Sequence, residues 1–368
     1  MNKKLGLVLT GGGARGAYQA GVLSIVGDMA HKEGKNFPFP IITGMSTGAI
    51  NSVILASHIE EDYRKAFDYL ENLWANIHCE DIYKTGGYNI LKNIFKWLFV
   101  LSTGGIGNQA VNLALFNTRP LRKFLKINTN FKKIQQRIQE EYFLGMGITA
   151  LSYESGHSTT FFQGCKQFEP WDRHQRMGVR SKLGISHVMA SSAIPLLFPS
   201  EGLNKQFYGD GSLRNPTPLS PAIHLGAEKL FVIGVTNKIS SKPVKTLPTP
   251  GKIMSVLMDS IFLDSIDSDL ERLERINQLV GSTEEKFKKI ETFVISPSED
   301  IGQIAKEEER HLKPFIKFLV NRLGSDEEVS DLVSYILFEP PYTQRLIDLG
   351  KKDALNRKEE IEKFILGG

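Results

Sequence analysis

Residues 41–50 read Ile-Ile-Thr-Gly-Met-Ser-Thr-Gly-Ala-Ile, and this segment gives the clearest indication of the fold. A strand predicted over 39–43 runs into a G-x-S-x-G pentapeptide, and an apolar helix is predicted directly after it. A serine on such a tight strand-to-helix turn is held with its hydroxyl exposed, and Gly44 and Gly48 leave room for the turn. The pattern therefore predicts that Ser46 is a nucleophile, the alternative being an ordinary turn serine.

A second glycine-rich turn lies near the start of the chain. Residues 11–16 read Gly-Gly-Gly-Ala-Arg-Gly, after a short apolar strand predicted over 5–9 and before a helix predicted over 14–29. The first, third and last glycines fit a dinucleotide-binding loop, but that fingerprint also needs an acidic residue at the end of the next strand, where this chain has none. The other interpretation is a loop whose backbone N–H groups point at an oxyanion. Only this second interpretation explains the serine turn one crossover later.

The order of strand, glycine turn and helix thus occurs twice in succession. Such repetition predicts a parallel sheet with crossover helices, and so an α/β fold. Further strands are predicted over 143–151, 159–162, 206–208, 230–236 and 292–295. Helices are predicted over 181–189, 261–279, 307–323, 327–338 and 342–364.

A serine nucleophile needs a base, and Asp210 is the first candidate. Residues 208–212 read Tyr-Gly-Asp-Gly-Ser, so a predicted strand ends in a sharp glycine turn that would hold the carboxylate at the sheet edge beside Ser46. The alternative for this aspartate is a common Asp-Gly turn. A Ser-Asp-His triad with His224 or His311 is a further alternative, although no motif surrounds either histidine.

Four patterns, taken in this order, resemble the patatin-like phospholipases, a family of serine lipid acyl hydrolases that use a Ser–Asp dyad without a histidine. They are the glycine-rich loop, the serine turn, an Ala-Ser-Ser-Ala-Ile-Pro block at 190–195 followed by Phe-Pro at 198–199, and Asp-Gly at 210–211. The resemblance covers residues 5–236. It implies a three-layer α/β/α fold with a mainly parallel central sheet, a helical lid-like insertion and a helical C-terminal extension.

The resemblance also implies roles for single residues. Ser46 would be the nucleophile and Asp210 the base of a mechanism with an acyl-enzyme intermediate. The residues expected to bind the oxyanion are Gly11, Gly12, Gly13, Arg15 and Gly16, and those that form the elbow are Gly44 and Gly48. One departure is Ser212, where the family usually has glycine or alanine. The expected substrates are fatty-acyl esters of phospholipids or lysophospholipids, with no metal and no cofactor.

Residues 58–140 interrupt the alternation of strands and helices and are predicted to form a lid-like insertion. Between residues 82 and 139 the chain has ten Lys or Arg and no Asp or Glu, although its net charge is only +4. A helix predicted over 91–99 has an apolar face with lysines beside it. These features predict peripheral contact with an anionic membrane. The apolar run 97–101 favours lipid over nucleic acid, and the alternative is a helical pair that extends the core.

The expected organisation is a catalytic domain over 1–236, a proline-marked linker over 237–251 and a mainly helical region over 252–368 packed on the catalytic domain. Hydrophobic residues make up 41% and charged residues 23% of the chain, which excludes wholesale disorder. Cys79 and Cys165 are predicted to be free thiols in a reducing compartment. No run of 18 apolar residues occurs, so the expected location is cytoplasmic, with peripheral contact to a membrane.

Three functions are compatible with the sequence. The first is a serine acyl hydrolase that acts on acyl lipids. The second is a lipid-binding or partner-binding protein with the same fold, and the third is a dinucleotide-binding enzyme that uses residues 11–16. The intact serine, aspartate and glycine loop favour the first.

Overall fold

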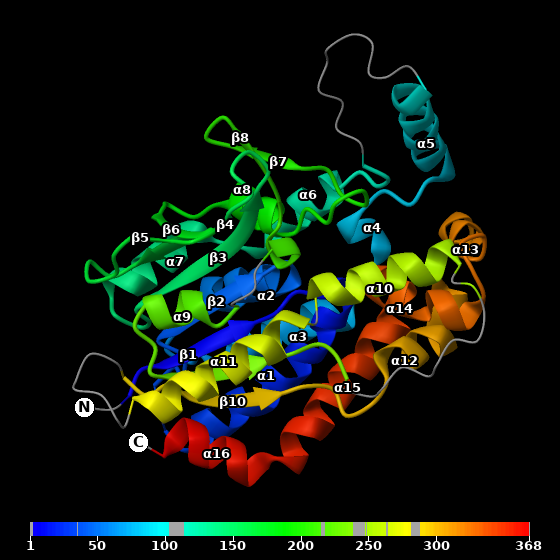
Figure 1. The fold of residues 1–368 in the computed structure, drawn as a ribbon. Helices are drawn as coiled ribbons and strands as arrows, with labels where there is room; N and C mark the ends of the chain where they lie inside the picture. Colours follow the sequence, from blue (N-terminus) through cyan, green and yellow to red (C-terminus); the bar gives the residue numbers. More distant parts are fainter. Residues whose placement is uncertain are drawn as a thin grey trace.

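A ten-stranded sheet lies between two layers of helices (Figure 1). It belongs to a computed structural model that describes residues 3–34, 36–102, 114–214, 218–237, 247, 249–262, 264–280 and 288–367. The strands are β1 (Leu5–Leu9), β2 (Ile41–Met45), β3 (Gly145–Ser152), β4 (Ser158–Gly164), β5 (Trp171–Arg173), β6 (Arg176–Arg180), β7 (Glu201–Leu203), β8 (Gln206–Asp210), β9 (Lys229–Ile233) and β10 (Glu291–Ile295).

The central part of this sheet is parallel. Its order is β10-β9-β1-β2-β3-β4-β6-β5, and every pair from β10 to β3 is parallel. Strand β8 pairs antiparallel with β3, so the end of β8 lies beside β3, the neighbour of β2. The topology therefore brings Asp210, the last residue of β8, to the region of the sheet where β2 ends and Ser46 begins.

Helices α1 to α9 and two short 3-10 turns connect and cover the strands up to β9. Their bounds are η1 (Gly13–Arg15), α1 (Gly16–Lys32), α2 (Thr47–Ser57), α3 (Arg64–Ala75), α4 (Cys79–Ile82), α5 (Gly87–Ser102), α6 (Arg119–Asn128), α7 (Phe131–Gln139), α8 (Ile185–Ser191), η2 (Gly211–Arg214) and α9 (Ser220–His224). The predicted insertion thus holds helices α3 to α7 between β2 and β3.

The C-terminal part is helical apart from β10. Its helices are α10 (Pro250–Phe262), α11 (Asp264–Leu279), α12 (Ile301–Glu308), η3 (Glu309–His311), α13 (Pro314–Val320), α14 (Asp326–Ile336), α15 (Pro340–Asn356) and α16 (Lys358–Leu366). Strand β10 pairs with β9, and α15 packs along α1. This part of the chain therefore contributes to both the sheet and one helical layer, while its division into domains stays a prediction.

Alternating side chains explain why the sheet needs a helical layer on each face. In β1, Leu7 and Leu9 belong to a large core with α1, α2, α3 and α15, whereas Val8 belongs to a second core with α9 and α11. Successive side chains of a strand point to opposite faces, so a strand that is apolar throughout must be covered twice. The predicted three-layer α/β/α architecture with a mainly parallel sheet is confirmed.

Several predicted elements need correction. The helix predicted over 307–323 is wrong as a single element, because Pro314 lacks an N–H and starts a new helix, α13. The helix predicted over 342–364 is divided near Arg357 into α15 and α16. Pro250 and Gly251, expected in the linker, begin α10, and most of the remaining linker lies outside the described residues. Both cysteines are free thiols.

Candidate active site

Ser46 stands at the sharp turn between β2 and α2, as the G-x-S-x-G pattern predicts. Its backbone has φ 51° and ψ −126°, a strained conformation for a residue with a side chain. A Cβ on Gly44 would lie 2.3 Å from the Gly48 carbonyl oxygen, and a Cβ on Gly48 would lie 2.1 Å from that of Leu9. Both glycines are therefore required by close backbone approach. The serine is only 2% exposed, in contrast to the exposed hydroxyl that the sequence predicts.

Two serines from α8 and its end hold the strained backbone of Ser46. The Ser46 N–H donates to Ser191 Oγ at 2.9 Å, and Ser191 Oγ donates to the Thr149 carbonyl at 2.6 Å. Ser192 Oγ donates to the Ser46 carbonyl at 3.2 Å. The Ala-Ser-Ser-Ala block, recognised in the sequence only as a pattern, thus fixes the backbone of Ser46 in place.

Asp210 ends β8 with its carboxyl group fully buried. Its N–H donates to the Ala193 carbonyl at 2.9 Å, and its Oδ1 accepts the Ser212 N–H at 2.9 Å. Its Oδ2 is buried and has no hydrogen-bond partner within the part of the chain that the structure describes. Burial raises the pKa of Asp210 to about 6, while the nearby Ser46 hydroxyl and the Ser212 amide and hydroxyl lower it. The structure therefore brings the two side chains close enough for the Ser46 hydroxyl to influence the pKa of Asp210.

The departure at Ser212 is accommodated without disturbing the turn. The residue is 6% exposed and its backbone N–H binds the aspartate. At the neighbouring Gly211 a side chain is not tolerated, because a Cβ there would lie 2.1 Å from the Thr149 carbonyl oxygen. The position that demands glycine is thus Gly211, which the chain retains.

Neither candidate histidine forms a hydrogen bond with Ser46 or Asp210 within the described residues. His224 stacks on Trp171 with ring centroids 4.6 Å apart, and burial and nearby arginines lower its pKa to about 4. His311 lies in η3 beside Glu308. The geometry gives no support to a Ser-Asp-His triad. Within the described ranges, no group of three or more His, Cys, Asp or Glu side chains could hold a metal ion.

The glycine loop lies against the serine elbow. Thr47 Oγ1 donates to the Gly13 carbonyl at 2.7 Å, and a Cβ on Gly16 would lie 1.9 Å from Thr47 Cγ2. Gly13 has φ 56°, and a Cβ there would lie 2.1 Å from the Tyr335 carbonyl oxygen. The N–H groups of Gly12 and Gly13 find no acceptor among the described residues. They are available to an oxyanion, and the Tyr335 backbone of α14 packs closely against Gly13. Gly11 is buried at the start of this loop.

The Arg15 side chain points toward the C-terminal helices. Its Nε donates to Ser334 Oγ at 2.7 Å, and its Nη2 lies 3.5 Å from Asp331 Oδ1 and 3.9 Å from Asp259 Oδ1. Its guanidinium also lies 4.0 Å from the centre of the Tyr335 ring. The side chain is 3% exposed, so these partners hold a buried charge. The expected contribution of Arg15 to the oxyanion site is therefore indirect, through the position of the loop.

A buried network of amide side chains lies under the loop and was not predicted from the sequence. Asn51 Nδ2 donates to the Gly16 carbonyl and to Gln19 Oε1, and Trp74 Nε1 donates to Asn51 Oδ1 at 2.7 Å. Gln19 Nε2 donates in turn to the Thr10 and Ile233 carbonyls. These contacts join residues distant in the sequence, and no local pattern signals them.

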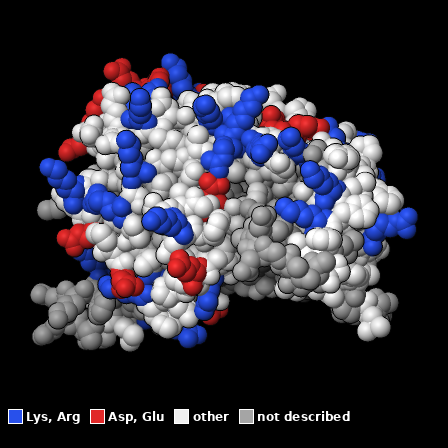
Figure 2. Space-filling model, turned by 90° about the horizontal axis from the view of Figure 1, so that it is seen from above, with Lys and Arg blue, Asp and Glu red and all other residues white. Residues whose placement is uncertain are grey.

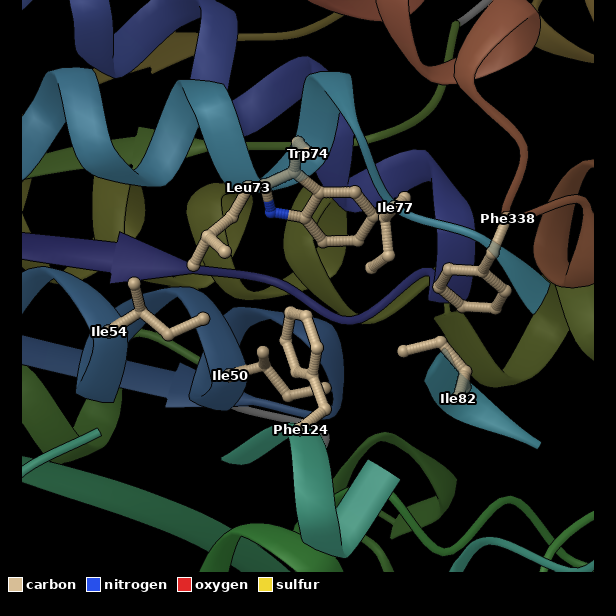
Figure 3. Close-up of a pocket in the computed structure, with 8 residues that line it drawn as sticks. All are labelled: Ile50, Ile54, Leu73, Trp74, Ile77, Ile82, Phe124 and Phe338. Carbon is tan, nitrogen blue, oxygen red and sulfur yellow. The ribbon is translucent and has the colours of Figure 1, made fainter. Parts of the chain in front are cut away.

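An apolar cavity of about 10 Å³ starts one helical turn beyond Ser46, at Ile50 (Figure 3). Residues from α2, α3, α4, α6 and the end of α14 surround it. They are Ile50, Ile54, Leu73, Trp74, Ile77, Ile82, Phe124 and Phe338. A cavity of this volume holds about one water molecule. A larger apolar group can enter only if some of these side chains move.

Comparison with known proteins agrees with this geometry. The family model of the patatin-like phospholipases matches residues 7–223, which is more than half of the chain. Among solved structures, the chain is similar to VipD from Legionella pneumophila, with a TM-score of 0.34 and 14% identity, over 94% of this chain and 67% of that chain. A likeness this weak implies nothing about function, and no curated protein sequence matches. On the family match, the chain belongs to the patatin-like phospholipase family.

Proposed function

We propose that this protein is a serine acyl hydrolase that cleaves fatty-acyl esters of phospholipids or lysophospholipids through a Ser46–Asp210 dyad. Family membership supports lipid acyl hydrolase activity in general. The observation that carries the finer proposal is the buried Asp210 carboxylate beside the strained Ser46, with an Oδ2 that has no hydrogen-bond partner among the described residues.

The proposed reaction has two halves. Asp210 takes the proton of the Ser46 hydroxyl while Oγ attacks the ester carbonyl carbon, and the oxyanion forms against the free N–H groups of Gly12 and Gly13. The intermediate then collapses, and the leaving alcohol takes the proton from Asp210. Water gives a proton to Asp210 and attacks the acyl-enzyme, and Ser46 recovers its proton as the fatty acid leaves.

The environment of Asp210 compensates for the weakness of a carboxylate base. An aspartate with the ordinary pKa is too weak a base to remove a proton from a serine hydroxyl efficiently. Burial disfavours the charged form and raises the pKa of Asp210 to about 6, which strengthens the base. A catalytic base works best when its pKa lies near the working pH.

The pH dependence of turnover is therefore a prediction. Asp210 must be ionised to act as base, so kcat/KM is expected to rise with pH and to level off above a midpoint near 6. An unburied aspartate would give a midpoint near 4. A profile measured with a soluble ester between about pH 4 and pH 8 separates the two, and a midpoint near 4 would contradict the role of the buried carboxyl.

A lipid surface is the proposed partner, and helix α5 is its first contact. Figure 1 shows α5 standing away from the body of the molecule. Its large apolar side chains on one side are strongly exposed: Tyr88 79%, Leu91 43%, Phe95 67% and Phe99 64%. Such an amphipathic helix is suited to lie in the interface of a membrane. Within the described residues, no helix is both long enough and apolar enough to span one.

The charge around α5 and α6 suits an anionic surface. Lys and Arg side chains are spread over the face seen from above in Figure 2. Seven of the ten basic residues between 82 and 139 are exposed and form no ion pair within the described part of the chain. They are Lys84, Lys92, Lys96, Arg119, Lys123, Lys126 and Lys132. Each basic residue near an anionic membrane contributes about 1 kcal/mol of attraction.

Release of fatty acid from phospholipid vesicles tests the proposal. The wild type is expected to release it faster from vesicles with anionic lipid than from neutral ones, and added salt should reduce the difference. Ser46→Ala should release none, although it should still bind the vesicles. Equal release by Ser46→Ala would assign the activity to another group, and binding without release by the wild type would favour a lipid-binding protein.

A further inference from the structure

Helix α10 exposes a group of apolar side chains to solvent, although it also buries Met258 in the core. Its solvent side carries Ile253, Val256 and Leu257, which are 50%, 50% and 52% exposed. Positions three and four residues apart lie on one helical face. Surface helices normally turn such a face toward the core.

Besides Met254 and Met258, which pack on the core, the protein-facing side of α10 carries polar contacts. Ser255 is fully buried, and its Oγ donates to Asp331 Oδ2 at 3.4 Å. Asp259 accepts a hydrogen bond from the Tyr335 hydroxyl at 3.0 Å and lies 3.9 Å from the Arg15 guanidinium. Turning α10 to bury its exposed apolar side would take Asp259 away from the buried Arg15 cation and Ser255 away from Asp331. The polar contacts therefore hold the apolar side outward.

Helix α10 also lies beside the dyad. It packs on η2, the turn that directly follows Asp210. Its contact with Arg15 reaches the glycine loop on the other side. A surface that receives α10 is consequently brought close to Ser46.

Exposed apolar residues continue from α10 to α5 through α13. The Gly251 N–H at the start of α10 donates to the Leu323 carbonyl, just after α13. Helix α13 exposes Phe318 by 52%, and its Phe315 lies against Gly87, the first residue of α5. These contacts link the three helices that carry the exposed apolar residues, and we call this set the α10–α13–α5 rim.

From these contacts we propose that α10 is a second docking helix, whose Ile253, Val256 and Leu257 enter the apolar layer of the lipid surface that α5 binds. The inference rests on the proposed function, since it places the substrate surface beside the dyad. A lipid surface is the occupant that the structure favours, because the rim continues into the unpaired basic residues of α5 and α6. Insertion of aliphatic side chains then adds an attraction that salt does not weaken.

The test compares Val256→Ser/Leu257→Ser with Leu355→Ser, a control on α15 whose leucine is 54% exposed but lies away from the rim. Three readouts are needed: sedimentation with phosphatidylcholine–phosphatidylglycerol vesicles at high salt, fatty-acid release from them, and turnover of a short-chain soluble ester. For the double variant we expect binding and vesicle hydrolysis to fall on the order of tenfold, with soluble-ester turnover within about twofold of the wild type. The control should match the wild type in all three.

Each contrary outcome has a definite meaning. Unchanged vesicle binding by the double variant would overturn the proposal and would fit a protein partner or a second copy on α10. An equal loss in the Leu355→Ser control, or an equal loss of soluble-ester turnover, would also overturn it. If the wild type hydrolyses no ester but the double variant alone loses vesicle binding, docking by α10 stands and the proposed hydrolysis fails.

Discussion

Asp210→Asn is expected to abolish measurable turnover and leave the fold intact. The amide cannot accept the Ser46 proton, and general base catalysis contributes about 10²–10⁴-fold to a rate. The structural cost should be small, because Oδ2 has no hydrogen-bond partner and Oδ1 can still accept the Ser212 N–H. The measurement is kcat on a soluble ester together with the melting temperature.

The pH dependence of stability provides an internal control for this variant. Folding raises the pKa of Asp210 from 3.8 to about 6, so the protonated carboxyl stabilises the folded state. This stabilisation is fully present below the unfolded pKa and is lost as pH rises through about 6. Asparagine does not ionise, so the variant does not lose stability in this way as pH rises. The melting temperature of Asp210→Asn relative to the wild type should therefore increase between about pH 4 and pH 7. A stable and fully active variant would exclude the dyad.

Gly13→Ala is expected to have the second largest effect. The new Cβ would lie 2.1 Å from the Tyr335 carbonyl oxygen, and φ at this residue is 56°. The Tyr335 carbonyl belongs to the backbone and cannot rotate away as a flexible side chain could. Either the glycine loop or α14 must therefore shift. Misplacing one oxyanion donor costs on the order of 10²–10³ in kcat. Steady-state kinetics with the soluble ester should show the loss in kcat more than in KM.

Gly34→Ala is the matched control for that variant. Gly34 has a similar φ of 62°, but nothing lies within 4 Å of the position of its Cβ. The left-handed conformation of the alanine should therefore lower the free energy of unfolding by only about 1–2 kcal/mol. Turnover of this variant should be unchanged. If Gly13→Ala retained the turnover of Gly34→Ala, the loop would have no part in binding the oxyanion.

The elbow and the general fold were predictable because their signals are local. A strained serine at the end of a strand needs glycines at fixed spacing, and Gly44 and Gly48 provide them where Cβ atoms would collide. The strands β5, β6 and β7 were not predicted, because β5 and β7 have only three residues each and β6 begins and ends with arginine. Short apolar runs identified the other strands but could not supply their order in the sheet.

The roles that escaped prediction depend on contacts between distant segments. Nothing near Arg15 indicates that its charge is held by Ser334, Asp331 and Asp259, more than 240 residues later. The periodicity of α10 likewise reveals an apolar face without revealing that Asp259 holds this face toward solvent. Sequence spacing shows which residues share a face, and only the fold shows what covers it.

The activation of Ser46 by Asp210 can be tested by labelling with a fluorophosphonate probe, read out by intact mass. We expect one adduct on the wild type and none on Ser46→Ala or Asp210→Asn, with vesicles present so that the buried serine can be reached. Equal labelling of Ser46→Ala would place the nucleophile elsewhere. Undiminished labelling of Asp210→Asn would show that Ser46 needs no help from the buried carboxylate and would contradict the account.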